Sequence, residues 1–405
     1  MQPAVGIIAE YNPFHNGHAH HLSRAKALSG CPYAIVIMSG SFVQRGEPAA
    51  FDKFQRARWA LFHGADLVFE LPASFACAGA ERFAAGGVAA LAATGLVSAL
   101  AFGAEHADLA LLSSLAFYGE TPASSERVSF HLKQGLSFPA ARARAYAETF
   151  PQPGEAEAFA APNNILAFEY LKALRALAPG ITPIPVARTG AVHDAPGIDA
   201  ESGFASASSL REAIRLGEIY SVRSAVPEDV AAEIESAVSE QRAPKGAERL
   251  SDAILYALRK CSRAELAALP DVGEGLENVL YEKARAAVDY PAFLAAVKTR
   301  RYTLARLRRI SMHALLGVDK TFLARHPAPR YLRVLGVRRD ALALLSALSE
   351  HASLPIVTGH EGYAALDAAA KEQFDLDLFS GELLAMASPT PEPAKNEFLR
   401  PLLIV

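Results

Sequence analysis

Two histidines in a short loop have the spacing needed for phosphate chemistry. His15 and His18 stand in the segment E-Y-N-P-F-H-N-G-H, which directly follows the apolar run Ala4–Ala9. Imidazoles three residues apart at the start of a helix can aim two donors at phosphate oxygens, and the helix dipole adds to the attraction. Gly17 lets the backbone approach an anion closely. The alternative is a loop with two ordinary surface histidines.

The elements around this loop are those of a nucleotide-binding sheet. Ala4–Ala9 predicts a strand buried on both faces, and a helix is expected from residue 17 or 18 to about 29. Further strands are expected at 33–38, 66–70, 100–102 and 182–187, and helices near 53–63, 77–94, 108–118, 139–149, 164–177 and 208–216. The alternation predicts an α/β fold, a Rossmann-like doubly wound parallel sheet. In such sheets ligands bind beyond the carboxyl ends of the strands, where the histidine loop stands.

The pattern changes after about residue 225. Helical periodicity dominates to about 317, and short apolar runs return at 331–337 and 354–357. We therefore expect a nucleotide-binding domain at 1–225 and a mainly helical domain at 226–405. The uncharged run 83–104 is rich in Ala and Gly, which favours a buried helix and strand over a membrane span.

Composition excludes several classes of protein. Hydrophobic residues make up 51% and charged residues 20% of the 405 positions, which excludes a disordered chain. The three cysteines are odd in number and form no CxxC pair, so neither a disulfide framework nor a cysteine-built zinc site is expected. This usage fits a reducing cytoplasm, which is the location we expect.

The formal net charge of −3 hides a strong asymmetry. Residues 298–339 hold twelve basic residues and one acidic residue, a charge of +11, and the rest of the chain carries −14. Arg outnumbers Lys in this segment, which favours contact with phosphates, and Tyr302 and Tyr331 could stack on bases or belong to the core. The alternative is a solvated helix face, but such faces usually mix charges of both signs. The segment indicates contact with nucleic acid.

The histidine loop resembles the HIGH-type signature of the nucleotidyltransferase superfamily. A second element of that superfamily, of the form I-S-S-T-x-I-R, is expected late in the domain. Ala205–Arg211, A-S-A-S-S-L-R, resembles it, with Ser206 and Ser208 at hydroxyl positions and Arg211 at the arginine. Such groups at a helix start suit the β- and γ-phosphates. A Ser-rich N-cap with a solvated Arg is the alternative.

A larger set of motifs resembles one family of this superfamily, the tRNA(Met) cytidine acetate ligases. The segments that carry the resemblance are Met38–Ala49, Glu70–Pro72, Ala80–Ala84, Phe102–Glu105, Pro162–Leu166, Gly275–Asn278 and Lys298–Thr303, which together span nearly the whole chain. Two departures stand out. Ser41 stands where the family usually has Asn, and Ala191-Val192 stand where it tends to have Gly-Tyr before His193-Asp194.

The resemblance implies a two-step reaction. Acetate would attack the α-phosphate of ATP, giving acetyladenylate and pyrophosphate. The wobble cytidine of elongator tRNA(Met) would then take the acetyl group as N4-acetylcytidine and release AMP. Free acetate is a poor acyl donor because its leaving group is oxide, whereas AMP leaves readily; positioning should matter more than a strong base.

The resemblance also implies site residues. ATP would bind along the loop that begins at Ile8, with His15 and His18 as catalytic residues that stabilise the departing charge. The other implied ATP positions are Ala9, Glu10, Tyr11, Asn12, Pro13, Phe14, Asn16, Gly17, His21, Gly103, Asn163, Asn164, Arg188, Ser206, Ser208 and Arg211. Some of them admit a purely structural reason: Gly103 as a turn glycine, Asn163 or Asn164 as a helix N-cap, and Arg188 as a surface side chain.

The remaining polar residues have less definite expectations. The tRNA would lie on Lys298, Arg300, Arg301, Arg306, Arg308 and Arg309. Arg45, Asp52 and Lys53 are expected near acetate or phosphate, or on a solvated loop. His193-Asp194 is open between a catalytic pair and metal ligands. We expect no protein-bound metal, and Mg²⁺ carried on the phosphates of ATP.

Two other functions stay open at this point. A small-molecule adenylyltransferase would explain the histidine loop but not the basic segment. A non-catalytic RNA-binding protein would explain the basic segment but leave His15, His18 and the Ser-x-Ser-x-x-Arg element without a role.

Overall fold

Strand β1 (Ala4–Ala9) lies inside the sheet because every one of its side chains is small or apolar. The computed structural model describes residues 3–150, 158, 161–188, 203–273, 275–394 and 396–405. β1 pairs in parallel with β2 (Tyr33–Ser39) on one side and with β6 (Val97–Ala104) on the other. Its carboxyl end therefore opens between two parallel neighbours, and the histidine loop leaves the sheet there.

The other strands extend the sheet on both sides. β5 (Leu67–Leu71) pairs in parallel with β2, and β7 (Thr182–Ala187) pairs in parallel with β6. From the C-terminal part, β8 (Leu332–Val337) pairs antiparallel with β5, and β9 (Ile356–Val357) and β10 (Leu403–Ile404) pair with β8. The strand order is β10-β8-β5-β2-β1-β6-β7. The predicted doubly wound sheet is confirmed, with a mixed rather than purely parallel edge.

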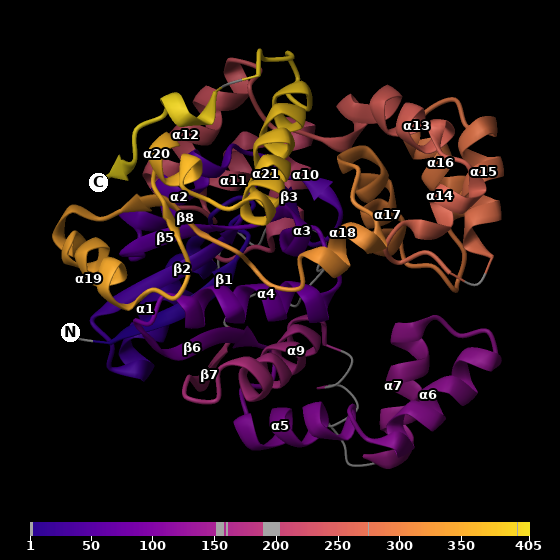
Figure 1. The fold of residues 1–405 in the computed structure, drawn as a ribbon, viewed down its shortest axis with the longest axis horizontal. Coiled ribbons are helices and arrows are strands. Elements are labelled where there is room, and N and C mark those ends of the chain that lie inside the picture. The colour runs from indigo at the N-terminus through magenta and orange to yellow at the C-terminus, as the bar shows by residue number, and fades with distance from the viewer. Residues whose placement is uncertain (1–2, 151–157, 159–160, 189–202, 274, 395) are drawn as a thin grey trace.

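Helices cover both faces of this sheet. On one face, α4 (Ala80–Ala93), α5 (Leu109–Tyr118), α9 (Pro162–Leu177) and α19 (Ala343–His351) share a core with alternate strand residues. On the other face lie α1 (Asn16–Ser29), α2 (Lys53–Phe62), α10 (Ala207–Leu216), α11 (Ile219–Arg223) and α12 (Glu228–Ser239). Figure 1 shows the two layers around the indigo strands. The alternation of buried strand side chains between two cores explains why these strands are apolar throughout.

A group of helices beside the sheet has a core of its own. Its members are α13 (Ser251–Lys260), α14 (Arg263–Ala268), α15 (Leu276–Ala286), α16 (Tyr290–Val297), α17 (Leu304–Leu316) and α18 (Lys320–Arg325). The chain then returns to the sheet through β8, β9 and β10, with α20 (His360–Ala364) and α21 (Ala368–Met386) between the last two (Figure 1). The division at residue 225 stays a prediction, but residues 226–405 include strands of the same sheet as residues 1–225.

Some elements differ from those expected. The helix expected at 77–94 is α4, which begins only at Ala80 because its N-cap Gly79 stands in extended backbone, and a separate short helix, α3 (Ala73–Ala76), precedes it. α6 (Pro122–Lys133) was not expected; it packs with α7 (Phe138–Thr149) away from the sheet (Figure 1). A short hairpin of β3 (Phe42–Val43) and β4 (Glu47–Pro48) was also not expected. Among the described residues, no helix combines the length and the apolar character needed to cross a membrane.

Candidate active site

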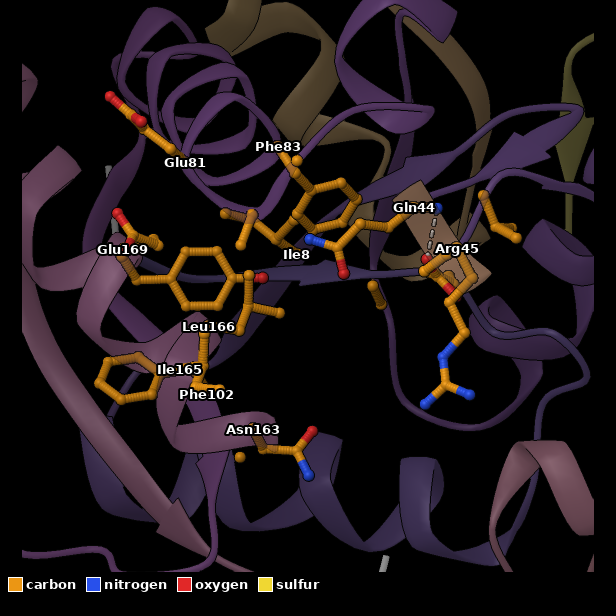
Figure 2. Close-up of a pocket in the computed structure, with 18 of the residues that line it drawn as sticks. Ile8, Gln44, Arg45, Glu81, Phe83, Phe102, Asn163, Ile165, Leu166 and Glu169 are labelled. Carbon is orange, nitrogen blue, oxygen red and sulfur yellow. Dashed lines mark hydrogen bonds between the residues drawn. The ribbon is translucent and has the colours of Figure 1, made fainter. Parts of the chain in front are cut away.

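A large cavity opens at the carboxyl ends of β1, β6 and β7. Its volume is about 1380 Å³, and its walls come from the β1–α1 loop, α4, α9, the start of α10 and α17. Figure 2 shows the part of the cavity that Phe83 of α4 and Asn163 and Leu166 of α9 face. Of the residues predicted from the sequence, it is lined by Ile8, Ala9, Glu10, Tyr11, Asn12, His15, Gly17, His18, His21, Gly103, Asn163, Arg188, Ser206, Ser208, Arg211, Arg301, Arg306 and Arg309. The fold thus brings together segments that are up to 300 residues apart in the chain.

The two histidines form a reciprocal cap at the start of α1. Nδ1 of His15 accepts from the backbone N–H of Gly17 at 3.1 Å, and Nδ1 of His18 accepts from the backbone N–H of His15 at 3.2 Å. The rings stack with centroids 3.6 Å apart. Because both Nδ1 atoms accept, both protons of the neutral rings sit on Nε2. Each ring therefore has a donor left for a ligand.

The electrostatics keep these rings neutral. Burial, with the charges of Arg188 and Arg211, lowers the pKa of His15 to about 3. Burial and the neighbouring His15 lower the pKa of His18 well below its usual value, and burial lowers the pKa of His21 to about 4. The positive charge at the loop therefore comes from guanidinium groups, while the imidazoles act as neutral donors.

The start of α10 closes one side of the loop. Ser206 is the N-cap of α10, and its Oγ lies 3.0 Å from Oγ of Ser208. Nη1 of Arg211, one turn further on, donates to the backbone carbonyl of Asn12 at 2.7 Å. The hydrogen bond from Arg211 to Asn12 thus holds the start of α10, with its serine hydroxyls, against the histidine loop.

Gly103 and Asn163 face the cavity from β6 and α9. A Cβ built on Gly103 meets only Cγ of Arg188, at 3.7 Å, so packing within the chain does not require glycine there. Asn163 points into the cavity (Figure 2), and its Nδ2 donates to Oε1 of Glu105 at 2.5 Å. The Glu105 carboxylate also accepts from the backbone N–H groups of Asn163 and Asn164, and so caps α9.

Four residues of the predicted nucleotide set do not line the cavity. Pro13 and Phe14 are buried beneath the loop. Asn16 donates to the carbonyls of Gly203 at 2.9 Å and Ser224 at 3.2 Å. Oδ1 of Asn164 accepts from the backbone of Glu105 at 3.0 Å, and its Nδ2 donates to Ala158 at 2.7 Å. These side chains hold loops in place. Ala191, Val192, His193 and Asp194 lie outside the described residues.

The basic segment divides into two parts. Lys298, Arg300 and Arg301 are exposed before α17, and Arg301, Arg306 and Arg309 line the cavity. Within α17, Nε of Arg306 donates to the carbonyl of Asp271 at 2.9 Å and Nε of Arg309 contacts its carboxylate at 3.0 Å. Arg308 does not line the cavity and pairs with Glu47.

Several of the later basic residues have partners within the chain, whether buried or exposed. Lys320 donates to the carbonyls of Ala267 and Val272, at 2.7 and 2.9 Å, Arg325 pairs with Glu372, and Arg338 pairs with Asp66. Tyr302 and Tyr331 are 8% and 1% exposed and belong to cores, so they are not stacking platforms. The summed charge of the segment therefore overstates the positive charge that is available on the surface for contact with nucleic acid.

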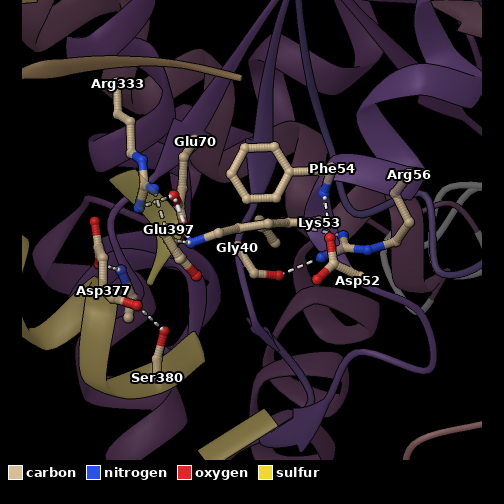
Figure 3. A network of polar contacts seen from close by, with 12 residues as sticks. Gly40, Asp52, Lys53, Phe54, Arg56, Glu70, Arg333, Asp377, Ser380 and Glu397 are labelled. Carbon is tan, nitrogen blue, oxygen red and sulfur yellow. Dashed lines mark hydrogen bonds and ion pairs between the residues drawn. The ribbon is translucent and has the colours of Figure 1, made fainter. Parts of the chain in front are cut away.

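Arg45, Asp52 and Lys53 were expected near acetate or phosphate, or on a solvated loop. Arg45 lines the cavity, but Asp52 and Lys53 do not. Asp52 caps α2 and pairs with Arg400 at 3.0 Å. Lys53 is 1% exposed and belongs to a buried charge network with Glu70, Arg333 and Glu397 (Figure 3). Its Nζ lies 2.8 Å from a carboxylate oxygen of both Glu70 and Glu397, and Nη1 of Arg333 lies 2.9 Å from Glu70.

Several cavity residues were not predicted from the sequence. Gln44, Phe83, Leu166 and Tyr170 line the cavity, and all but Tyr170 lie inside motifs that were recognised as segments without roles for these side chains. Tyr170 stands four residues after Leu166 on α9, so the helical period could have placed it on the same face. In the part of the chain that the structure describes, no group of three or more His, Cys, Asp or Glu residues could hold a metal ion.

Comparisons with known proteins agree with this geometry. The family model described as HIGH Nucleotidyl Transferase matches residues 1–397. The tRNA(Met) cytidine acetate ligase of Caldanaerobacter subterraneus subsp. tengcongensis is 36% identical, over 99% of both chains, and that of Acetivibrio thermocellus is 35% identical, over 99% of both. The crystal structure of Thermotoga maritima TmcAL bound with alpha-thio ATP is 32% identical, with a TM-score of 0.88 over 99% of both chains. Its apo form has a TM-score of 0.91 at 33% identity, over 100% of this chain and 99% of that one.

Proposed function

The chain belongs to the tRNA(Met) cytidine acetate ligase family of the HIGH nucleotidyl transferases, and from this membership we propose that it acetylates the wobble cytidine of elongator tRNA(Met) at the expense of ATP. The observation that carries the proposal is the cavity itself. Its phosphate-facing loop presents two Nε2–H donors and the guanidinium of Arg211, and Arg301, from the exposed basic stretch before α17, lines the same cavity. One cavity thus offers groups for both substrates.

In the first step, acetate reacts with ATP. A carboxylate oxygen forms a bond to the α-phosphorus, the bond from that phosphorus to the bridging oxygen breaks, and pyrophosphate leaves with the electron pair. His15 and His18 donate from Nε2 to the phosphates, and Arg188 and Arg211 balance the charge that grows on the leaving group. Because the histidines are neutral, they stabilise this charge as hydrogen-bond donors and not as cations.

Most of the other residues that we assign to ATP line the walls of the cavity. We assign the nucleotide to the loop that begins at Ile8 and includes His21, with Gly103 beside the adenosine and Asn163 and Arg188 as further contacts. Ser206 and Ser208 face the outer phosphates. Pro13, Phe14, Asn16 and Asn164 act indirectly, by holding the loops. Mg²⁺ enters with ATP on its phosphate oxygens, as is usual for this ion.

In the second step, the cytidine N4 amine attacks the acetyl carbon. The bond from that carbon to the phosphate oxygen breaks, AMP leaves with the electron pair, and the proton from N4 passes to water. Lys298, Arg300 and Arg301 hold the tRNA backbone, and Arg306, Arg308 and Arg309 shape α17 through their pairs with Asp271 and Glu47.

One assay tests the whole proposal. Protein, ATP and labelled acetate are incubated with and without bulk tRNA. We expect labelled acetyladenylate without tRNA and label in tRNA when it is present, at N4-acetylcytidine after nuclease digestion. Adenylate that forms but never transfers to RNA would favour a small-molecule adenylyltransferase. RNA binding with no acetate-dependent use of ATP would favour a non-catalytic protein.

A further inference from the structure

One wall of the cavity combines apolar side chains with two polar atoms that have no partner. Ile8, Phe83, Phe102 and Leu166 face this part of the cavity (Figure 2). The hydroxyl of Tyr170 and Nε2 of Gln44 are buried beside them and have no hydrogen-bond partner among the described residues. Tyr170 is 3% exposed. A buried donor without a partner costs about 1–3 kcal/mol, so two on one wall indicate a ligand that accepts from both.

Both donors are held in place by their surroundings. The ring of Tyr170 packs against Phe102 with centroids 5.8 Å apart, and burial raises the pKa of its hydroxyl, which therefore keeps its proton. The backbone N–H of Gln44 donates to Oε1 of Glu10 at 2.9 Å, and its carbonyl accepts from Nη1 of Arg309 at 3.5 Å. These contacts fix the residues without using the two free donors.

We propose, building on the function proposed above, that this wall is the acetate subsite. The methyl group packs on Ile8, Phe83, Phe102 and Leu166. The Tyr170 hydroxyl and the Gln44 amide donate to the carboxylate oxygen that does not attack, which leaves the other oxygen free to bond to the α-phosphorus. The ligand class is a short monocarboxylate, and the apolar wall limits its chain length.

The observations favour a carboxylate over the cytosine base. N4 of cytosine is a donor and needs an acceptor beside it, and the carboxylates on this side of the cavity are those of Glu10 and Glu169. Oε1 of Glu10 already accepts from the backbone N–H of Gln44 at 2.9 Å. The carboxylate of Glu169 already faces Arg142 at 3.4 Å and Lys172 at 3.1 Å. The amide nitrogen of Gln44 can only donate, which matches a carboxylate oxygen.

The first test removes one donor. Tyr170→Phe should raise the KM for acetate at least tenfold in acetate-dependent ATP–pyrophosphate exchange, while the affinity for a nonhydrolysable ATP analogue changes less than twofold. Tyr290→Phe is the matched control, since Tyr290 is a buried tyrosine of α16 that does not line the cavity. It should leave the KM for acetate unchanged. Retained analogue binding shows that each variant is folded.

The second test enlarges the pocket. One methylene is worth roughly 10–200-fold in selectivity, so Leu166→Ala should raise the ratio of kcat/KM for propionate over acetate at least tenfold. An active wild type with both variants unchanged in KM and acid selectivity would overturn the subsite alone. Loss of transfer to tRNA with normal exchange in Tyr170→Phe would also overturn it, and would assign the wall to the base. No acetate-dependent exchange in the wild type would instead overturn the proposed function.

Discussion

The cavity and the buried charge network lie at different strands of one sheet, β1, β6 and β7 for the cavity and β5 and β8 for the network, and they differ in how their polar groups are paired. In the network of Lys53, Glu70, Arg333 and Glu397, each cation lies within ion-pair distance of two carboxylates. In the cavity, the hydroxyls of Tyr11 and Tyr170 and the amide nitrogen of Gln44 have no partner among the described residues. Burial alone therefore does not identify a functional site, and neither does a missing partner alone, since Nη1 of Arg333 and the hydroxyl of Tyr290 also lack a hydrogen-bond partner among the described residues. Unpartnered donors that line an open cavity do point to a site, because a ligand can accept from them there.

The pKa shifts follow the same division. In the cavity, burial and nearby guanidinium groups keep His15 neutral, in the form that donates to an anion. Beside the network, burial and the negative Glu70 raise the pKa of Asp377 to about 7, and Asp377 is held by the backbone of Ala73 and the hydroxyl of Tyr331. The first shift prepares a site for a ligand, and the second is a cost of packing.

The largest expected effect comes from breaking the network. Lys53→Met leaves two buried carboxylates with Arg333 as their remaining cation, and should lower the free energy of unfolding by about 3–5 kcal/mol. Chemical denaturation measures this. Below the unfolding transition, the rate of acetyladenylate formation should stay within a few-fold of wild type. Loss of activity without loss of stability would place Lys53 in the site after all.

The second prediction concerns the cavity: a substitution of His15 can remove its hydrogen-bond donor to the ligand and keep its role as the N-cap of α1. His15→Asn keeps an N-cap acceptor for α1 but loses the Nε2–H donor, so acetyladenylate formation should fall by about 10²–10³ with little change in Tm. His63→Asn is the control, because His63 pairs with Asp229 at 2.9 Å outside the cavity. Normal rates in His15→Asn would show that the capping role is its whole role.

The pH dependence of stability separates the network from the cavity. The folded state holds the Asp377 proton, which the unfolded chain loses near pH 4, so this contribution is present below about pH 4 and is lost as pH rises to 7. Asp377→Asn cannot titrate. Its stability relative to wild type should therefore rise by roughly 2–3 kcal/mol between pH 4.5 and pH 8, as measured by urea unfolding. A pH-independent difference would show that Asp377 titrates normally.

The two parts of the basic segment allow a matched comparison. Arg300→Glu with Arg301→Glu should spare acetyladenylate formation, raise the KM for tRNA by about 10–100-fold, and reduce the salt dependence of that KM. Arg339→Glu reverses an exposed charge of the same segment beyond β8 and should leave the KM for tRNA unchanged. Equal effects of both changes would mean that the field of the whole segment, and not its start, attracts the tRNA.

The smallest effect concerns room for the nucleotide. Gly103→Ala adds a methyl that meets only Cγ of Arg188, so Tm should stay unchanged while the Kd for ATP rises about tenfold. Gly180→Ala is the control, since a Cβ there has no neighbour within 4 Å among the described residues. Unchanged ATP binding in Gly103→Ala would remove this position from the nucleotide set.

The sequence predicts what is local and misses what depends on distant partners. The strand at Ala4–Ala9 and the helix after His15 follow from a continuous apolar run and a capped loop. The antiparallel pairing of β8 with β5 joins residues more than 250 positions apart, and no periodicity encodes it. For the same reason Lys53 and Arg333 could not be recognised as partners of Glu70 and Glu397. Whether the donors and acceptors of a buried side chain all find hydrogen-bond partners depends on residues that are distant in the sequence, and therefore on the tertiary structure.

The return of the chain to the sheet has a consequence for synthesis on the ribosome. Glu397 contributes a carboxylate to the network, and β10 completes the edge beside β8. A nascent chain that has not yet reached these positions holds Lys53 and Arg333 with one of their two carboxylates missing. The sheet that carries the cavity, although most of its strands are encoded first, thus reaches its final stability only when the last strand emerges.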